Sequence, residues 1–243
     1  MEKQERIAKI IAAAGICSRR DAERLIGEGR VSVNGKKLDT PAFLARFKDD
    51  IRVDGKPIAK PEQPRLFLYH KPAGLVTTHR DEKDRDTIFQ KLPKGMPRVV
   101  SVGRLDLNSE GLLLLTTSGT ISRYLELPKT GWKRRYRVRV HGAVDDARLK
   151  KLEKGLTIEG VRYAPMTINL DMKRDGGNSW LTITLQEGKN REIRRIMEFV
   201  GLKVSRLIRI SYGVFELGDL PKGAVKEIPF KQLKNSLPAE VLV

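Results

Sequence analysis

Four consecutive leucines, Leu112 to Leu115, limit the possible folds of this chain more than any other stretch. The run LLLLTT is too short to form a helix of its own, and continuous apolar runs of this length are typical of buried strands. A buried strand needs neighbouring strands at its edges and other elements over its faces. The run therefore predicts a central strand of a sheet.

Asp106 lies just before this run, in VGRLDLNSEGLLLLTTSG, where the chain would enter the sheet. A carboxylate placed there is partly desolvated, which disfavours its ionised form unless a cation or hydrogen-bond donors stabilise it. Two interpretations follow. Asp106 is either a turn residue that makes local hydrogen bonds, or an ionised group that acts in catalysis at the mouth of the strand. For a lone aspartate, the local pattern favours the turn.

Residues 1–60 have the pattern of a small separate module. Residues 4–14 predict an amphipathic helix, and Ser18 is typical of an N-cap residue that begins a second helix. The dipeptides Asn34-Gly35 and Asp54-Gly55 favour tight hairpin turns because they tolerate positive φ. We therefore expect two helices followed by hairpins.

The proline-containing stretch AKPEQPR follows this module and has little to bury. We place a linker at residues 61–64, a larger domain at 65–235 and a C-terminal tail at 236–243. In the larger domain, strands and helices alternate irregularly and include a hairpin with an Asp-Gly-Gly-Asn turn at 175–178. This order predicts an α+β fold with a mixed, mainly antiparallel sheet rather than a doubly wound one.

The charge of the chain limits its partners. The formal net charge is +18, from 48 lysines and arginines against 30 acidic residues, which indicates a polyanionic partner. Nucleic acid is favoured over an anionic membrane, because no apolar run approaches the ~18 residues of a spanning helix. The N-terminus lacks a signal-peptide pattern, so we expect a cytoplasmic protein.

We expect no metal and no disulfide in this chain. Cys17 is the one cysteine, so no internal disulfide is possible, and this fits a reducing compartment. The three histidines do not have the close spacing of zinc ligands.

The segment GICSRRDAERLIGEGRVSVNGK, with its Ser-Arg-Arg step and Val-Asn-Gly turn, resembles an S4 RNA-binding domain. The resemblance implies structured RNA as a partner and carries no implication of catalysis. On charge pattern alone, the exposed basic residues of this module are either an RNA-binding surface or a solvated face without a ligand. The expected RNA-contacting residues of the module are Arg6, Lys9, Ser18, Arg19, Arg20 and Arg30.

The motif around Asp106 resembles the signature of one branch of the ribosomal pseudouridine synthases, which comprises type A of the small subunit together with types B, E and F of the large subunit. LYHKPAGLVTT, RRYRVRV and GKNREIRRIMEFVGLKVSRLIRISYG are similar to further motifs of that family, and the last looks most like type B. The resemblance implies that Asp106 is catalytic, that Tyr136 is the active-site tyrosine, and that Arg194 pairs with the catalytic carboxylate. Where the family usually has aspartate, this chain has Ser118, which is also able to cap the following helix.

The implied reaction breaks the N-glycosidic bond of a uridine, turns the base and rejoins it through carbon. The uridine must first leave the base stack, and Tyr136 offers an aromatic face for it. The resemblance implies no metal and no organic cofactor. Whether Asp106 attacks the ribose, attacks the base or removes a sugar proton stays open from sequence. The basic residues expected to contact RNA near this cleft are Arg104, Lys133, Arg134, Arg135, Lys189 and Arg191.

We therefore predict a monomeric ribosomal RNA pseudouridine synthase with a tethered S4 domain. Its expected substrate is 23S ribosomal RNA, as a stem-loop or in the assembling large subunit. One alternative is a type A enzyme of the small subunit, which would act on 16S RNA. Another alternative is a non-catalytic S4-type RNA-binding or ribosome-assembly factor.

Overall fold

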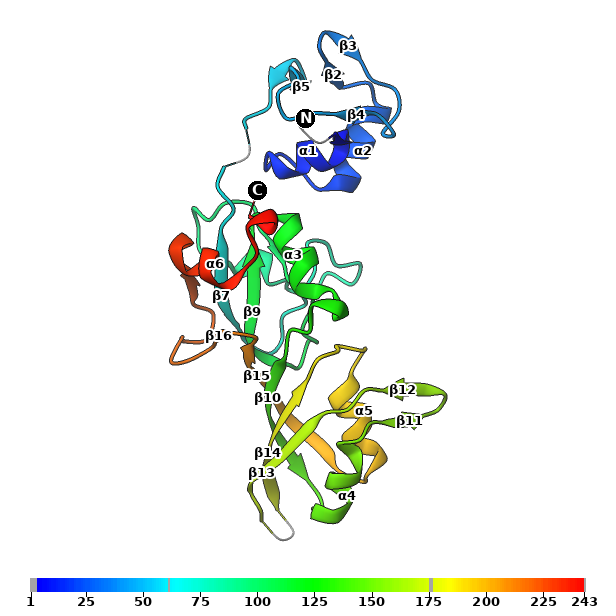
Figure 1. The fold of residues 1–243 in the computed structure, drawn as a ribbon, viewed down its shortest axis with the longest axis vertical. Helices are drawn as coiled ribbons and strands as arrows, with labels where there is room; N and C mark the ends of the chain where they lie inside the picture. Colours follow the sequence, from blue (N-terminus) through cyan, green and yellow to red (C-terminus); the bar gives the residue numbers. More distant parts are fainter. Residues whose placement is uncertain (1–3, 61, 175–176, 243) are drawn as a thin grey trace.

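The computed structural model describes residues 4–60, 62–174 and 177–242. Its larger part is one nine-stranded sheet with the strand order β13-β14-β10-β15-β9-β7-β17, to which β16 and β8 are attached (Figure 1). β15 and β9 run parallel, and the other neighbouring strands of this sheet run antiparallel. The predicted α+β fold with a mixed, mainly antiparallel sheet is confirmed.

The strands of this sheet are β7 (Leu66–Lys71), β8 (Val100–Ser101), β9 (Glu110–Thr116), β10 (Arg134–His141), β13 (Thr167–Met172), β14 (Asn178–Leu185), β15 (Lys203–Tyr212), β16 (Phe215–Glu216) and β17 (Val225–Glu227). The helices around it are α3 (Gly119–Glu126), α4 (Asp146–Leu152), α5 (Glu192–Phe199) and α6 (Phe230–Ser236). Three short 3₁₀ helices are η1 (Phe89–Lys91), η2 (Pro128–Thr130) and η3 (Ala239–Val241).

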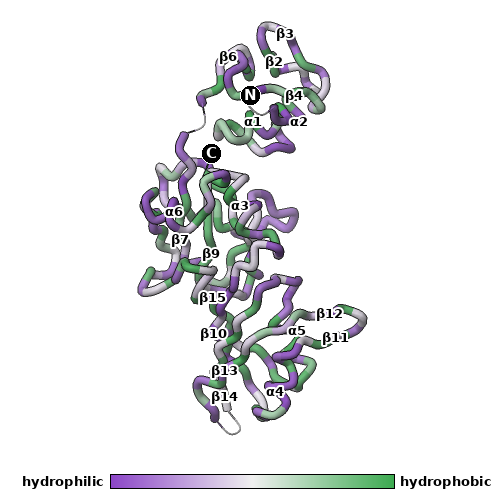
Figure 2. The backbone as a smooth tube through the Cα atoms, in the orientation of Figure 1, coloured by the Kyte–Doolittle hydropathy of each residue, from purple (hydrophilic) through white to green (hydrophobic). Residues whose placement is uncertain are grey.

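The leucine run forms β9, which has the colour of hydrophobic residues in Figure 2. Every residue of β9 is buried, as predicted. Side chains alternate along a strand, so the run contributes to two apolar clusters. Leu113 and Leu115 belong to the cluster that contains the apolar residues of α4 and α5. Leu112 and Leu114 belong to the cluster that contains those of α3 and α6. β9 thus contributes leucine side chains to the apolar clusters on both faces of the sheet.

The N-terminal module forms the helices and hairpins predicted for it. It contains β1 (Glu5–Arg6), α1 (Ile7–Ala13), α2 (Arg19–Gly27), β2 (Val31–Val33), β3 (Lys36–Lys37), β4 (Leu44–Ala45), β5 (Ile51–Val53) and β6 (Lys56–Pro57). The first helix begins at Ile7 rather than at residue 4, because Glu5 and Arg6 pair with β4 instead. Ser18 caps α2, since its hydroxyl accepts a hydrogen bond from the Asp21 N–H at 3.1 Å.

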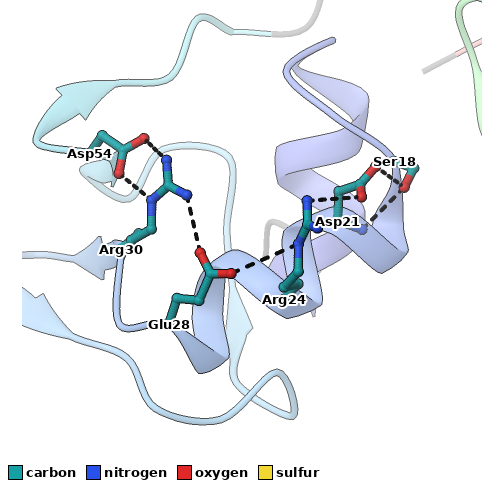
Figure 3. A network of polar contacts seen from close by, with 6 residues as sticks. All are labelled: Ser18, Asp21, Arg24, Glu28, Arg30 and Asp54. Carbon is teal, nitrogen blue, oxygen red and sulfur yellow. Dashed lines mark hydrogen bonds and ion pairs between the residues drawn. The ribbon is translucent and has the colours of Figure 1, made fainter.

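A network of polar contacts fixes the end of α2 against the turn between β5 and β6 (Figure 3). Arg30 donates two hydrogen bonds to Asp54, both at 2.7 Å, and a third to Glu28 at 3.0 Å. Asn34 and Asp54 have φ of 49° and 52°, as the Asx-Gly turns require.

Two of the features that were not predicted from the sequence are a hairpin and a helix. The first is the hairpin of β11 (Leu156–Ile158) and β12 (Val161–Tyr163), whose strands are short and only partly apolar. The second is α6, which packs with Leu237 and Val241 into the α3 side of the sheet. Part of the predicted 175–178 turn, residue 61 of the predicted linker and Val243 of the predicted tail lie outside the described residues. Across the described ranges, no helix is long and apolar enough to cross a membrane.

The parallel pairing of β9 with β15 requires glycine at position 111. Gly111 lies opposite Arg209 with φ of +102°, and a Cβ at Gly111 would be 2.3 Å from the Arg209 carbonyl oxygen. We expect Gly111→Ala to lower the free energy of unfolding by more than ~2 kcal/mol, because the backbone must shift. Urea unfolding measures this change.

Gly223→Ala is the matched control, because Gly223 has φ of +79° with nothing within 4 Å of its added Cβ. This control tests positive φ alone, which costs roughly 1 kcal/mol. Equal losses in the two variants would show that the contact with Arg209 is not what selects glycine at 111.

Candidate active site

A cleft of about 920 Å³ opens beside the N-terminal end of β9. Asp106, in the loop before β9, and Tyr136, in β10, both line this cleft. Of the basic residues expected near it, Arg104, Arg134, Lys189 and Arg191 line it, whereas Lys133 and Arg135 do not. The fold thus brings the carboxylate and the aromatic side chain singled out from the sequence to one cavity.

Hydrogen bonds from the segment after β7 fix the loop that carries Asp106. The Thr77 hydroxyl donates to the Leu105 carbonyl at 2.9 Å, and the Leu105 N–H donates back to the same hydroxyl at 3.3 Å. The Gly74 N–H donates to the Leu107 carbonyl at 2.8 Å. Asp106 itself is half-buried, and its carbonyl accepts the Ser109 N–H at 3.0 Å. The segment 71–77 therefore holds the chain on both sides of Asp106.

Lys71 is fully buried under the same loop and was not singled out from the sequence. Its ammonium donates to the carbonyls of Ser109 at 2.9 Å and Pro72 at 3.0 Å, and to that of Leu107 at 3.4 Å. Burial lowers the pKa of Lys71 to about 8, and the carboxylates of Asp106 and Glu110 oppose that shift. The motif LYHKPAGLVTT, which contains Lys71, was visible in the sequence, but the burial of Lys71 was not.

Arg194 lies close to Asp106 without bonding to it. Its guanidinium donates to the Asn108 carbonyl at 3.0 Å and to the Val204 carbonyl at 3.4 Å. Burial lowers the pKa of Arg194, as does the charge of Arg191, while Asp106 raises it. Across the described ranges, no ion pair joins Asp106 and Arg194, so the expected direct pair is absent. Arg194 instead holds the backbone two residues after Asp106.

Side-chain alternation along β10 separates the residues predicted there. Tyr136 is buried on the side of the sheet that faces α5, where it lies opposite Ile183 of β14. Arg134 is also buried and donates to the Tyr212 hydroxyl and the Gln186 carbonyl, both at 2.7 Å. Arg135 is exposed and pairs with Glu216 at 3.2 Å. The side chain of Arg135 therefore points away from the cleft.

Arg209 lines the cleft and is a second residue that sequence reasoning missed. It is buried, and its Nε donates to the Leu112 carbonyl at 2.7 Å. Its guanidinium lies 5.2 Å from the centre of the Tyr212 ring. Its Nη2 is buried and has no hydrogen-bond partner in the described part of the chain. A buried cationic donor without a partner is suited to an anionic or carbonyl group of a ligand.

Two glutamates meet where the loop 187–191 enters α5. Glu192 is buried, and its carboxyl accepts the Lys189 N–H at 2.9 Å. Burial raises the pKa of Glu192 to about 7, and the neighbouring Glu187 carboxylate contributes to this rise. Burial also raises the pKa of Glu187, but the Ala164 N–H and the Lys189 ammonium outweigh this and lower it. Below about pH 7, Glu192 is therefore the protonated member of the two, and it lines the cleft.

The basic residues predicted in the N-terminal module have different roles. Arg6, Arg19 and Arg20 are exposed, and none has an ion-pair partner among the residues that the structure describes. Lys9 pairs with Glu5 at 2.7 Å. Arg30 is neutralised by its acidic neighbours (Figure 3).

Two family models match the chain. The one described as RNA pseudouridylate synthase matches residues 65–199, and the one described as S4 domain matches residues 5–51. A solved structure described as a crystal structure of pseudouridylate synthase covers 96% of this chain and 99% of its own, with a TM-score of 0.66 at 24% identity. That likeness shows a shared fold.

Curated relatives are similar over nearly the whole chain. An uncharacterized RNA pseudouridine synthase of Rickettsia felis is 53% identical over 95% of this chain and 100% of its own length. A ribosomal large subunit pseudouridine synthase B of Escherichia coli is 43% identical over 94% of this chain and 80% of its own length.

The raised pKa of Glu192 predicts a pH dependence of stability. Between its unfolded value of 4.5 and its folded value of about 7, the folded state binds more protons than the unfolded state, so stability falls as pH rises. Glu192→Gln mimics the protonated form and should remove this fall, which is at most ~3 kcal/mol. Urea unfolding between about pH 5 and about pH 8 measures the fall.

Glu198→Gln is the matched control, because Glu198 is an exposed glutamate on the same helix. It should keep the pH dependence of the unchanged protein. The same slope in all three proteins would contradict a protonated Glu192.

Proposed function

The chain belongs to the RNA pseudouridylate synthase family, and from this premise we propose that it isomerises uridine in ribosomal RNA with Asp106 as its catalytic carboxylate. The observation that carries the proposal is the position of Asp106. It lies in a cleft with Tyr136, on a loop that Lys71 and Arg194 hold through backbone carbonyls.

The cleft is suited to a nucleotide that has left its stack. Flipping a uridine costs a few kcal/mol, and stacking on an aromatic ring returns ~1–3 kcal/mol of that cost. Tyr136 offers such a ring on the cleft wall. The exposed residues Arg104 and Arg191 also line the cleft and are suited to phosphates on either side of the flipped nucleotide.

The reaction rearranges one nucleotide without a net change in its atoms. The bond between ribose C1′ and uracil N1 breaks, the base turns, and a bond forms between C1′ and C5. The C5 proton leaves, and N1 gains one. Asp106 is the carboxylate beside these atoms, and the cations of Lys71 and Arg194 lie close enough to interact with its charge.

We propose large-subunit 23S ribosomal RNA as the substrate because the relatives named ribosomal large subunit pseudouridine synthase B are 42–43% identical to this chain. We also propose that the S4 module captures this RNA, that the chain acts as a monomer in the cytoplasm, and that its domains divide at 1–60, 61–64, 65–235 and 236–243. The alternative is a type A enzyme of the small subunit, which would act on 16S RNA. Mapping the modified uridines in ribosomal RNA distinguishes the two.

Asp106→Asn should abolish the reaction while leaving RNA binding intact, because it removes the charge and keeps the shape. Tritium release from ribosomal RNA labelled at uridine C5 measures the chemical step, and the expected loss exceeds roughly 10³-fold. Asp219→Asn, at an exposed aspartate of the loop after β16, is the control and should react normally. Full tritium release by Asp106→Asn would end the catalytic assignment.

Lys71→Met should lower turnover by roughly 10- to 100-fold with little change in RNA affinity, because the Asp106 loop loses its buried donor. Single-turnover rates at saturating RNA measure the loss, and filter binding measures the affinity. Lys226→Met, at an exposed lysine of neighbouring β17, is the control. An unchanged rate would show that the loop keeps its position without Lys71.

A further inference from the structure

The side of the sheet opposite the cleft carries a row of arginines on β10. Arg135, Arg137 and Arg139 alternate with Tyr136, Val138 and Val140, which are buried against α5. The three arginines therefore point away from α5. We call the solvent side of β14, β10 and β15 at these residues the arginine–tryptophan face.

Trp180 of β14 lies among these arginines. It is directly opposite Arg139 in the register of β10 and β14. The Arg137 guanidinium lies 4.7 Å from the centre of its ring, and that of Arg139 lies 6.0 Å from it. Stacking on an indole holds a guanidinium plane in place while its N–H edges stay available.

The arginine–tryptophan face keeps a surplus of positive charge. Arg135 pairs with Glu216, and Arg206 of β15 pairs with Glu110. Arg137 and Arg139 have no ion-pair partner within the described ranges, and the Arg139 Nε donates to the Ser205 hydroxyl at 2.9 Å. Lys203, opposite His141 at the end of β10, adds an exposed charge. Asp171 of β13 accepts a hydrogen bond from the hydroxyl of Thr182, the residue opposite Arg137, at 2.8 Å. The cationic side chains of the face still outnumber its carboxylates.

None of the described helices covers this face. The apolar residues of α4 and α5 pack on the other side of these strands, and those of α3 and α6 pack against β7 and β9 (Figure 1). An exposed antiparallel sheet face ordinarily carries mixed polar residues, whereas this one carries stacked arginines. Its charge and its indole match phosphates and bases.

We infer that the arginine–tryptophan face is a second RNA-contact surface, which binds phosphates of the substrate RNA beyond the nucleotides that enter the cleft. This inference rests on the proposed function, since it takes ribosomal RNA as the ligand. Arg137 and Arg139 supply the phosphate contacts, and Trp180 orients both.

The test compares Arg137→Gln/Arg139→Gln with Lys231→Gln/Lys234→Gln, a control that removes two exposed charges from α6. The probes are in vitro transcribed large-subunit ribosomal RNA and a short uridine-loop hairpin. The arginine variant should bind the long RNA roughly tenfold more weakly, with a salt slope lower by about 1.4 to 1.8 for two phosphates. Hairpin binding and thermal stability should not change.

Unchanged affinity of the arginine variant for the long RNA overturns the inference, and so do equal losses in both variants. Loss of binding only to large-subunit precursor particles, with normal binding to naked RNA, also overturns it and indicates a protein partner. Pseudouridine formation by the unchanged protein is measured separately. If that reaction is absent, the proposed function fails whatever the two variants bind.

Discussion

The buried ammonium of Lys71 is the contact on which the rest of the site depends. It joins the end of β7 to the loop before β9 through the carbonyls of Leu107 and Ser109. An ammonium in an apolar interior is costly unless its donors are satisfied, so this loop has little freedom to move away. Asp106 is fixed because the backbone around it completes the bonding of a buried cation.

The arginines of this protein fall into two groups, those that are buried or paired within the fold and those that are exposed. Arg134 and Arg209 are buried against Tyr212, and Arg30 and Arg206 are paired with acids. These arginines build the fold and the cleft wall. The exposed arginines that we propose to contact RNA lie at the cleft, on the N-terminal module and on the arginine–tryptophan face. The net charge of +18 is therefore larger than the charge that any single binding surface carries.

The two faces of the sheet carry different functional groups, the cleft on one side and exposed arginines on the other. On the α5 side, β10 presents Tyr136 to a cleft that the buried Glu192 also lines. On the other side, the same strand presents arginines to solvent. Strand alternation alone makes this division, since neighbouring residues of β10 belong to opposite faces.

The sequence by itself determined most of the secondary structure and the identity of the motifs. The leucine run, the Ser18 and Ser118 caps and the alternation of β10 are local patterns, and the structure confirms each of them. Only the tertiary structure decided which charges meet. The burial of Lys71 under the loop before β9 and the contact of Arg194 with the Asn108 carbonyl depend on segments far apart in the chain. A pattern of neighbouring residues carries no information on such distances.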